Sequence, residues 1–457
     1  MKYWLETLGC PKNQVDSDKL AGTLRAEGYS PAREPQAADL IVVNTCAFIE
    51  AARQESIDTV LDLHGARRGD ARLVVTGCLA ERYGQELADA LPEVDLVAGF
   101  GVPLTQPAGT PAGGAVPVAL SRKPDRSRAT TPSFDLLNLP RPASEAPWAY
   151  LKVAEGCNRS CGFCAIPSFR GKQRSRELEV LLDEVDALGA QEIVLVAQDL
   201  ASYASDLGRR GEIVDLVRAV AARVPRTRLL YLYPSELSES LIEVMGETGC
   251  HYFDLSLQHV SRPHLRRMRR WGDGPRFLER VANIRRRYPD AAFRSSFIIG
   301  YPGETEDDQD QLLRFLEEAE LDWAGLFPFS PEEGTHAAGL GDQVPPSLVE
   351  ERLAECSELQ DGITARRRQE LVGTGARVLV DRPGVGRSHR EAPEIDGIIR
   401  IPTHLATGTF VDVQITAAFG VDLEGSVAVD PAAGPHPRPE LWGAGPAEPA
   451  SAPSGPR

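Results

Sequence analysis

The chain has 457 residues, of which 42% are hydrophobic and 25% are charged, the composition of a globular protein rather than of a disordered one. A chain of this length exceeds a single hydrophobic core, so it predicts about three domains. Its 50 Lys and Arg against 66 Asp and Glu leave a net charge of −16, which disfavours a main role in gripping phosphate backbones, because that work needs a basic surface.

Residues 1–105 alternate short apolar runs with charged helical stretches. The runs predict strands at 3–8, 40–45, 73–76 and 94–98, and the stretches predict helices at 16–27 and 51–63. Apolar strands that alternate with helices favour an α/β domain built on a parallel sheet covered on both faces. The Pro-, Gly-, Ala-, Ser- and Thr-rich residues 106–146 predict a linker.

A second series of strands and helices occupies residues 147–370. We expect strands at 149–154, 192–198, 228–233, 252–258, 293–300 and 323–329, and helices near 177–188, 212–224, 238–247, 275–287, 306–319 and 347–371. Six strands are too few for the eight-stranded parallel barrel, so the pattern predicts a partial, open (βα) barrel.

Residues 371–435 contain short β-branched runs at 377–380, 398–401, 409–415 and 426–429, punctuated by Gly and Pro. This pattern predicts a small all-β barrel at the end of the chain. The Pro-, Gly- and Ala-rich residues 436–457 predict a disordered tail.

The chain contains eight cysteines and no segment suited to a membrane. No apolar run approaches the roughly 20 residues of a spanning helix, and the first residues lack the apolar core of a signal peptide. We therefore expect a cytoplasmic protein with no membrane partner. That compartment keeps thiols reduced, so cysteines placed in a pattern indicate metal binding rather than disulfides.

Three cysteines, Cys157, Cys161 and Cys164, lie in one loop directly after the first expected strand of the central domain. We call them the loop cysteines. Three thiolates with the spacing Cys-x3-Cys-x2-Cys can bind three irons of a cubane cluster and leave the fourth iron open for a cofactor. A zinc knuckle is the alternative, but structural zinc takes four ligands, and no Cys or His nearby supplies the fourth. The loop therefore indicates a 4Fe–4S cluster.

Cys10, Cys46 and Cys78 are far apart in the sequence, yet each follows the end of an expected strand of the first domain. We call them the strand-end cysteines. Parallel strands present their carboxyl ends on one edge of a sheet, so we expect these thiols to converge and to hold a second cluster. Cys250 and Cys356 follow neither pattern and are expected to be packing residues.

The cysteine loop, with aromatic Phe163 before its last cysteine, resembles the radical S-adenosylmethionine superfamily. The resemblance implies that the open iron binds the amino and carboxylate groups of S-adenosylmethionine, which is then cleaved reductively. Two further pairs of residues could contact that cofactor. They are Gln198 and Asp199 after the second central strand, and Gly300 and Gly303 after the fifth, where glycine permits close backbone approach. For the glycines, an ordinary turn is the alternative.

Nearly the whole chain resembles the methylthiotransferases, which combine such a first domain, a radical core and a small terminal barrel. The segments 9–17, 43–49, 257–259, 330–335 and 392–397 are similar to the RimO-like branch, which methylthiolates an aspartate of the twelfth small-subunit ribosomal protein. In the first segment, Pro11 and Lys12 stand where the transfer-RNA branch typically has Gln-Met. Gln14, where an aliphatic residue is expected, is a departure.

This resemblance implies two 4Fe–4S clusters, S-adenosylmethionine and an external electron donor. The cluster on the loop cysteines would yield a 5′-deoxyadenosyl radical, which removes a hydrogen from the β-carbon of the substrate aspartate. A radical route suits that carbon, because it is far too weak an acid for a general base. The cluster on the strand-end cysteines would supply the sulfur, which a second S-adenosylmethionine methylates.

The terminal barrel resembles the TRAM domain, which grips nucleic acid in the transfer-RNA branch. Residues 371–430 carry five Arg and no Lys against eight Asp and Glu, the wrong sign for binding phosphate. We expect its acidic loops, with Asp381, Glu391, Glu394 and Asp396, to attract a basic ribosomal protein rather than nucleic acid. Methylthiolation of transfer RNA is the alternative function, and a non-catalytic iron–sulfur or RNA-binding scaffold is a third.

Two further features leave alternatives open. The basic run 266–270 fits either an anionic partner or a solvated helix face. His259 fits either a substrate contact or a hydrogen-bonded core residue.

Overall fold

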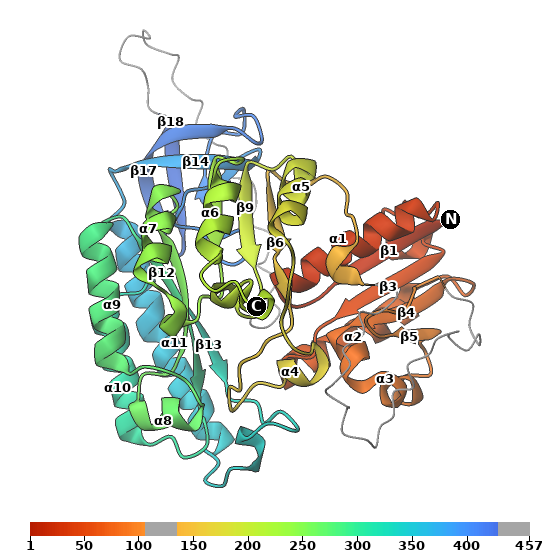
Figure 1. Cartoon of the computed structure of the whole chain (residues 1–457), viewed down its shortest axis with the longest axis horizontal. Coiled ribbons are helices and arrows are strands. Elements are labelled where there is room, and N and C mark those ends of the chain that lie inside the picture. Colours follow the sequence, from red (N-terminus) through yellow and green to blue (C-terminus); the bar gives the residue numbers. More distant parts are fainter. Residues whose placement is uncertain (106–134, 428–457) are drawn as a thin grey trace, which may run out of the picture.

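The computed structural model describes residues 1–105 and 135–427 (Figure 1). The first domain is the expected parallel sheet, with strand order β2–β1–β3–β4–β5. Its elements are β1 (Lys2–Thr7), α1 (Pro11–Ala26), β2 (Ser30–Pro31), β3 (Leu40–Thr45), α2 (Glu50–Ala66), β4 (Arg72–Gly77), α3 (Cys78–Ala90) and β5 (Leu96–Ala98). Every residue of β3 is buried, as expected for a central strand covered on both faces.

Helix α1 begins at Pro11 rather than at residue 16, because Cys10 is its N-cap and proline suits the first helical position. Its buried face is largely polar and includes Lys12, Asn13, Asp16 and Lys19. This face packs against the central domain rather than water, as the contacts of α1 with β6 (Trp148–Lys152) show.

The central domain is the predicted partial barrel. One three-stranded parallel sheet has the order β10–β9–β6 and a second has the order β11–β12–β13, and a parallel bridge between Leu232 and Leu255 joins them. The other strands of these two sheets are β9 (Glu192–Val196), β10 (Arg226–Leu229), β11 (Tyr252–Gln258), β12 (Ala292–Ile299) and β13 (Trp323–Pro328). A separate antiparallel pair consists of β7 (Ala154–Glu155) and β8 (Arg174–Ser175).

Helices of the central domain pack against these strands in one continuous hydrophobic core. They are α5 (Leu178–Leu188), α6 (Ile213–Ala221), α7 (Glu239–Glu247), α9 (Gly274–Arg287), α10 (Glu306–Ala319) and α11 (Pro346–Gln369), with the short α4 (Ile166–Phe169) and α8 (Arg262–Arg267) beside the loops. Cys250 and Cys356 are 2% and 0% exposed, as expected for packing residues. Over the described ranges, no helix is both long and apolar enough to cross a membrane.

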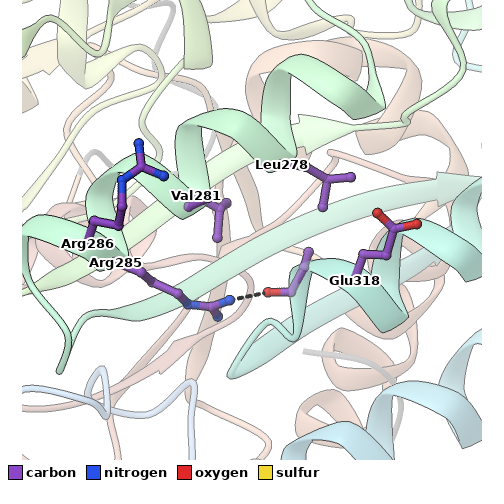
Figure 2. A pocket seen from close by; sticks show the side chains of 7 residues that line it. Leu278, Val281, Arg285, Arg286 and Glu318 are labelled. Carbon is purple, nitrogen blue, oxygen red and sulfur yellow. Dashed lines mark hydrogen bonds between the residues drawn. The ribbon is translucent and has the colours of Figure 1, made fainter.

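A hollow of about 460 Å³ opens between α9 and α10 on the outside of the barrel (Figure 2). Arg285 reaches across it and donates a hydrogen bond to the backbone oxygen of Ala319 at 2.7 Å. The hollow is lined by Leu278, Val281, Ala282, Arg285, Arg286, Glu318 and Ala319. None of these is a predicted site residue, so this surface feature is separate from the cysteine sites.

The segment between the first two domains is packed where the structure describes it. Leu136 and Leu137 are buried, and Arg141 pairs with Asp18 of α1 and Glu184 of α5, both at 2.9 Å. This end of the expected linker 106–146 therefore ties α1 to α5. Residues 106–134 of that linker lie outside the described ranges.

The terminal domain is a closed barrel with strand order β14–β15–β16–β18–β17, as the β-branched runs predict. Its strands are β14 (Gly375–Arg382), β15 (Val385–Arg387), β16 (Ile399–Arg400), β17 (Phe410–Phe419) and β18 (Asp422–Val427). Strand β15 has no counterpart in the sequence prediction. The predicted tail 436–457 lies outside the described residues.

Buried ion pairs dock the barrel on the central domain. Glu192 of β9 accepts from Arg228 at 2.7 Å and faces Arg387 of the barrel at 3.1 Å. Glu391 pairs with Arg368 of α11 and accepts from the Ser388 hydroxyl at 2.6 Å. These contacts fix the barrel at the end of the sheet that lies opposite the cysteine loop.

Asp396 joins the same interface: it accepts from the Tyr252 hydroxyl at 2.6 Å and lies 3.4 Å from Arg294. The expectation that the acidic loops face a basic partner is therefore wrong for Glu391 and Asp396, whose side chains are 0% and 2% exposed. Asp381 pairs with Arg387 at 2.6 Å. The exposed charges of the described barrel are Arg377, Arg382 and Arg400 against Glu394, Asp412 and Glu424. They balance in sign, so charge alone does not select the substrate.

We expect Glu391→Ala to lower the free energy of unfolding by about 3–5 kcal/mol, because it leaves the Arg368 guanidinium buried without its carboxylate. Burial opposes ionisation of Glu391, but Arg368 and Ser388 outweigh it and lower its pKa to about 2. Because the folded pKa lies below the ordinary one, this stabilisation is full above that ordinary value and is lost as the pH falls toward 2. Urea denaturation at several pH values tests this. Exposed Glu424→Ala is the control, and an equal loss in both variants would contradict the docking role.

Candidate active site

The loop cysteines are held by backbone hydrogen bonds at the carboxyl end of β6. Cys157 N–H donates to the Gly171 oxygen at 3.1 Å, and Gly162 N–H donates to the Met268 oxygen at 2.8 Å. Gly156 has a φ of +75°, and an added Cβ there would lie 2.3 Å from the Lys172 backbone oxygen. Only glycine fits that turn. The loop is therefore a defined structure rather than a loose connection.

Two donors point at the sulfurs of this loop. The backbone N–H of Arg159 lies 3.4 Å from the Cys157 sulfur, and the Arg270 guanidinium lies 3.5 Å from the Cys161 sulfur. Arg270 is stacked on the Tyr233 ring, 3.9 Å from its centroid. Arg270 thus faces the cysteine loop, so the basic run 266–270 is not simply a solvated helix face.

Burial raises the pKa of Cys157 to about 11 and that of Cys164 to about 12. Metal binding requires thiolates, so a bound metal displaces protons from these groups. Without metal they are neutral thiols at pH 7, which disfavours a role as free nucleophiles.

The strand-end cysteines converge as the strand pattern predicts. Cys10 caps α1 after β1, Cys46 follows β3, and Cys78 begins α3 after β4. An added Cβ on Gly9 would lie 2.9 Å from the Cys46 sulfur. Burial, together with the nearby Cys78 and Cys10 thiols, raises the pKa of Cys46 to about 12. The three thiols are thus close enough to influence one another's ionisation.

Within residues 1–105 and 135–427, no three His, Cys, Asp or Glu side chains meet closely enough to hold a single metal ion. The ligands of a cubane cluster each bind a different iron, so they surround the group rather than meet at one point. The absence of a single-ion site among the described residues therefore does not bear on a cluster at either cysteine group.

Gln198 and Asp199 lie beside the cysteine loop. Gln198 donates to Glu155 at 3.0 Å, and Asp199 accepts from Arg159 at 2.6 Å. Gln198 Oε1 and Asp199 Oδ1 are buried and have no hydrogen-bond partner in the part of the chain that the structure describes. Such orphaned acceptors suit a donor group of a bound ligand.

The other predicted cofactor residues are more closely tied to packing. An added Cβ would meet Val349 of α11 at Gly300 (2.4 Å) and the Arg267 guanidinium at Gly303 (2.1 Å). Both glycines thus make room for neighbouring side chains. Phe163 is half-buried and packs with the cluster around Met268.

His259 is fully buried: Nδ1 accepts from Ser261 N–H at 3.0 Å, whereas Nε2 lies 3.6 Å from Glu304 and has no hydrogen-bond partner among the described residues. One ring nitrogen is thus hydrogen-bonded as in a core residue, while the other is a buried orphan, so both interpretations of His259 stand.

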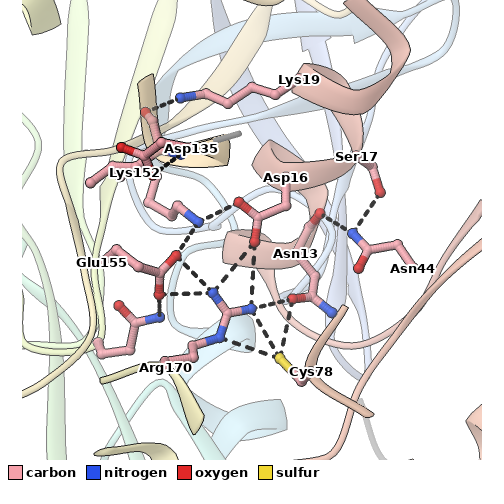
Figure 3. Close-up of polar contacts among 12 residues, drawn as sticks. Asn13, Asp16, Ser17, Lys19, Asn44, Cys78, Asp135, Lys152, Glu155 and Arg170 are labelled. Carbon is pink, nitrogen blue, oxygen red and sulfur yellow. Dashed lines mark hydrogen bonds and ion pairs between the residues drawn. The ribbon is translucent and has the colours of Figure 1, made fainter. Parts of the chain in front are cut away.

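A buried polar network that the sequence did not suggest runs from the Cys78 sulfur to Glu155, which stands two residues before Cys157 (Figure 3). Arg170, after α4, donates to the Cys78 sulfur at 3.0 Å, to Asn13 at 2.6 Å and to Glu155 at 2.9 Å. Lys152 pairs with Asp16 and, at 2.6 Å, with Glu155. Asn13 and Asp16 belong to the motif after Cys10, which was a usable signal, whereas nothing in the sequence marks Arg170.

A second contact between the domains involves the segment 330–335. Glu332 is 2% exposed and pairs with Arg53 of α2 and Arg82 of α3, both at 2.5 Å. The Glu50 N–H donates to the Ser330 hydroxyl at 3.2 Å. This segment therefore docks the first domain on the loop after β13.

Three regions of the chain match known families. Residues 2–99 match the uncharacterized protein family UPF0004, residues 151–316 match the radical SAM superfamily, and residues 372–428 match the TRAM domain. These matches fall on the three structural units described above.

Among solved structures, the radical S-adenosylmethionine methyltransferase TsrM of Kitasatospora setae superposes with a TM-score of 0.51 at 14% identity, over 80% of this chain and 90% of that one. This is a likeness of fold alone.

Similar curated proteins span nearly the whole chain. The ribosomal protein uS12 methylthiotransferase RimO of Roseiflexus sp. is 40% identical over 94% of this chain and 98% of its own length. The proteins of the same name from Moorella thermoacetica and Aquifex aeolicus are 41% and 40% identical, over 91% and 93% of this chain and 96% and 97% of their own lengths. Such identity over nearly full length places the chain in the RimO family of ribosomal protein uS12 methylthiotransferases.

Proposed function

We propose that this enzyme adds a methylthio group to the β-carbon of an aspartate in ribosomal protein uS12, using S-adenosylmethionine and two 4Fe–4S clusters. The observation that carries the proposal is the presence of two separate cysteine groups, with a buried network that runs from the Cys78 sulfur to Glu155 beside the loop cysteines. Reductive cleavage of S-adenosylmethionine uses the loop cysteines alone, so the second cysteine group serves a further task, for which we propose sulfur transfer. Identity of about 40% to three uS12 methylthiotransferases over more than 90% of the chain supports the substrate.

The residues present fit the proposed groups. The loop cysteines offer three ligands, and the orphaned oxygens of Gln198 and Asp199 lie beside them, suited to the amino group of S-adenosylmethionine. When bound, the loop cluster supplies the electron that cleaves S-adenosylmethionine, and the strand-end cluster supplies the sulfur.

The chain itself positions these groups and shields them. The Arg159 guanidinium binds Asp199, and the Arg159 backbone N–H faces the Cys157 sulfur. Arg159 therefore orients both the cysteine loop and Asp199, a predicted ligand of the cofactor. The side chains of Asp16, Lys152 and Arg170 are at most 2% exposed, so they separate the space between the two sites from bulk water. Exclusion of water protects a reactive radical from side reactions.

We further propose that the enzyme works in the cytoplasm with an external electron donor. Its eight cysteines are all free, and both cysteine groups need a reducing compartment to remain available to iron.

Offered equal amounts of uS12 and unmodified transfer RNA, the reconstituted enzyme should place the methylthio group on uS12 only. Mass spectrometry of both substrates measures this. The same mixture with an enzyme that lacks the loop cysteines is the control and should give no product. Methylthio product on the RNA alone would show that uS12 is not the substrate and would favour the alternative, methylthiolation of transfer RNA. The balanced exposed charge of the described barrel does not exclude that alternative.

A further inference from the structure

Arg170 belongs to the central domain but points its guanidinium at the first domain. Its side chain is 1% exposed. Nη2 and Nε lie 3.0 Å and 3.3 Å from the Cys78 sulfur, so two N–H groups of the planar fork converge on one thiol (Figure 3). Among the strand-end cysteines, Cys78 alone receives a side-chain donor of this kind within the described residues.

The opposite side of the guanidinium is held in place. Nη1 donates to both carboxylate oxygens of Glu155 at 2.9 Å, and Nη2 also donates to Asn13 at 2.6 Å. The Phe100 ring lies 4.9 Å from the guanidinium carbon. Because arginine presents its donors in a rigid plane, the grip of Glu155 also sets the direction of the two bonds to sulfur.

Glu155 extends the connection to the radical site. It immediately precedes Gly156 and Cys157, and it accepts from Gln198 at 3.0 Å. The Arg170 side chain therefore lies between the Cys78 thiol and the Glu155 carboxylate. Glu155 in turn positions Gln198, a predicted contact of S-adenosylmethionine.

Donors to a ligand sulfur affect the reduction potential of a cluster. An N–H···S bond and a nearby positive charge stabilise the reduced cluster, which is one charge more negative, more than they stabilise the oxidised one. Burial strengthens this effect, because little water is present to screen the charge.

We propose that Arg170 is a positioning residue that raises the reduction potential of the cluster on the strand-end cysteines and links its Cys78 ligand to the radical site through Glu155. The inference rests on the proposed function, because it requires that cluster.

The test uses the full chain with the loop cysteines replaced by alanine, so that only the strand-end cluster is present. In this parent, Arg170→Gln removes both the positive charge and the pair of N–H donors to sulfur. Arg170→Lys keeps the charge but loses the planar pair of donors. Arg176→Gln is the matched control: its side chain is 3% exposed and binds Glu184 and the Lys152 backbone, but no thiol. Each protein is reconstituted anaerobically, assayed for iron and titrated with dithionite while the reduced cluster is followed by electron paramagnetic resonance.

At the potential that half-reduces the parent, we expect the ratio of reduced to oxidised cluster in Arg170→Gln to fall about tenfold, which is about 59 mV for one electron. Arg170→Lys should show a smaller shift in the same direction, and Arg176→Gln none. A midpoint equal to the parent's in both Arg170 variants would overturn the inference while leaving the proposed function intact. If Arg170→Gln does not retain iron, the midpoint potential of Arg170→Lys is compared with that of the parent instead, and an equal value overturns the inference. A parent that binds no iron would instead overturn the proposed strand-end cluster, and the inference with it.

Discussion

Replacing Cys157, Cys161 and Cys164 together by alanine should abolish reductive cleavage of S-adenosylmethionine and lower the iron content from about eight to about four per chain. The loss should be complete, because these thiols are the only proposed ligands of the open-iron cluster. Iron analysis and the yield of 5′-deoxyadenosine after dithionite reduction measure both effects.

The double variant Cys250→Ala and Cys356→Ala is the control, because it removes two cysteines that belong to neither predicted cluster site. Both residues are buried packing residues outside the two groups, so the variant should keep about eight irons and its cleavage activity. Loss of all iron from the loop variant would contradict two independent sites. Zinc in place of iron in the unsubstituted protein would contradict the cluster itself.

Replacing Cys10, Cys46 and Cys78 by alanine should separate the two activities. Cleavage of S-adenosylmethionine should persist, because the loop cysteines and Gln198 belong to the central domain. Methylthiolated uS12 should vanish, because no sulfur source remains. Parallel assays of 5′-deoxyadenosine and of the mass of uS12 measure these outcomes.

The matched control for this variant is Arg53→Gln. It weakens the contact of the first domain with Glu332 but touches neither cysteine group, so it should retain product formation. Arg82, which lies 2.5 Å from Glu332 in the unsubstituted chain, should keep the two domains in contact. Product from the strand-end variant equal to that of the unsubstituted enzyme would show that the first domain is not the sulfur donor.

The cysteine groups were predictable because their signals are local. The loop cysteines are close in sequence, and the strand-end cysteines follow apolar runs whose strands had to be parallel. Helix α1 shows the limit of such signals. Lys12, Asn13 and Asp16 have the character of a solvated face, and only the packing of α1 against the central domain makes them part of the site.

The terminal barrel shows the same limit for charge. Counting residues predicted an acidic surface, but Glu391 and Asp396 neutralise Arg368 and Arg294, which belong to the central domain. A count of charged residues does not show whether each side chain faces water or is paired with a residue distant in the sequence.

The sequence by itself determined the three domains, the two cysteine groups and the family that they resemble, because periodicity, spacing and strand ends are properties of short segments. Only the tertiary structure decided that Arg170 lies between Cys78 and Glu155 and that Glu332 joins two domains. It also decided that Glu391 and Asp396 hold the terminal barrel on the central domain. Each of those outcomes depends on pairing polar or charged groups more than 20 residues apart, for example Arg53 with Glu332 at a separation of 279 residues. Burial of such charges is favourable only when all partners are assembled, so no segment alone carries the information.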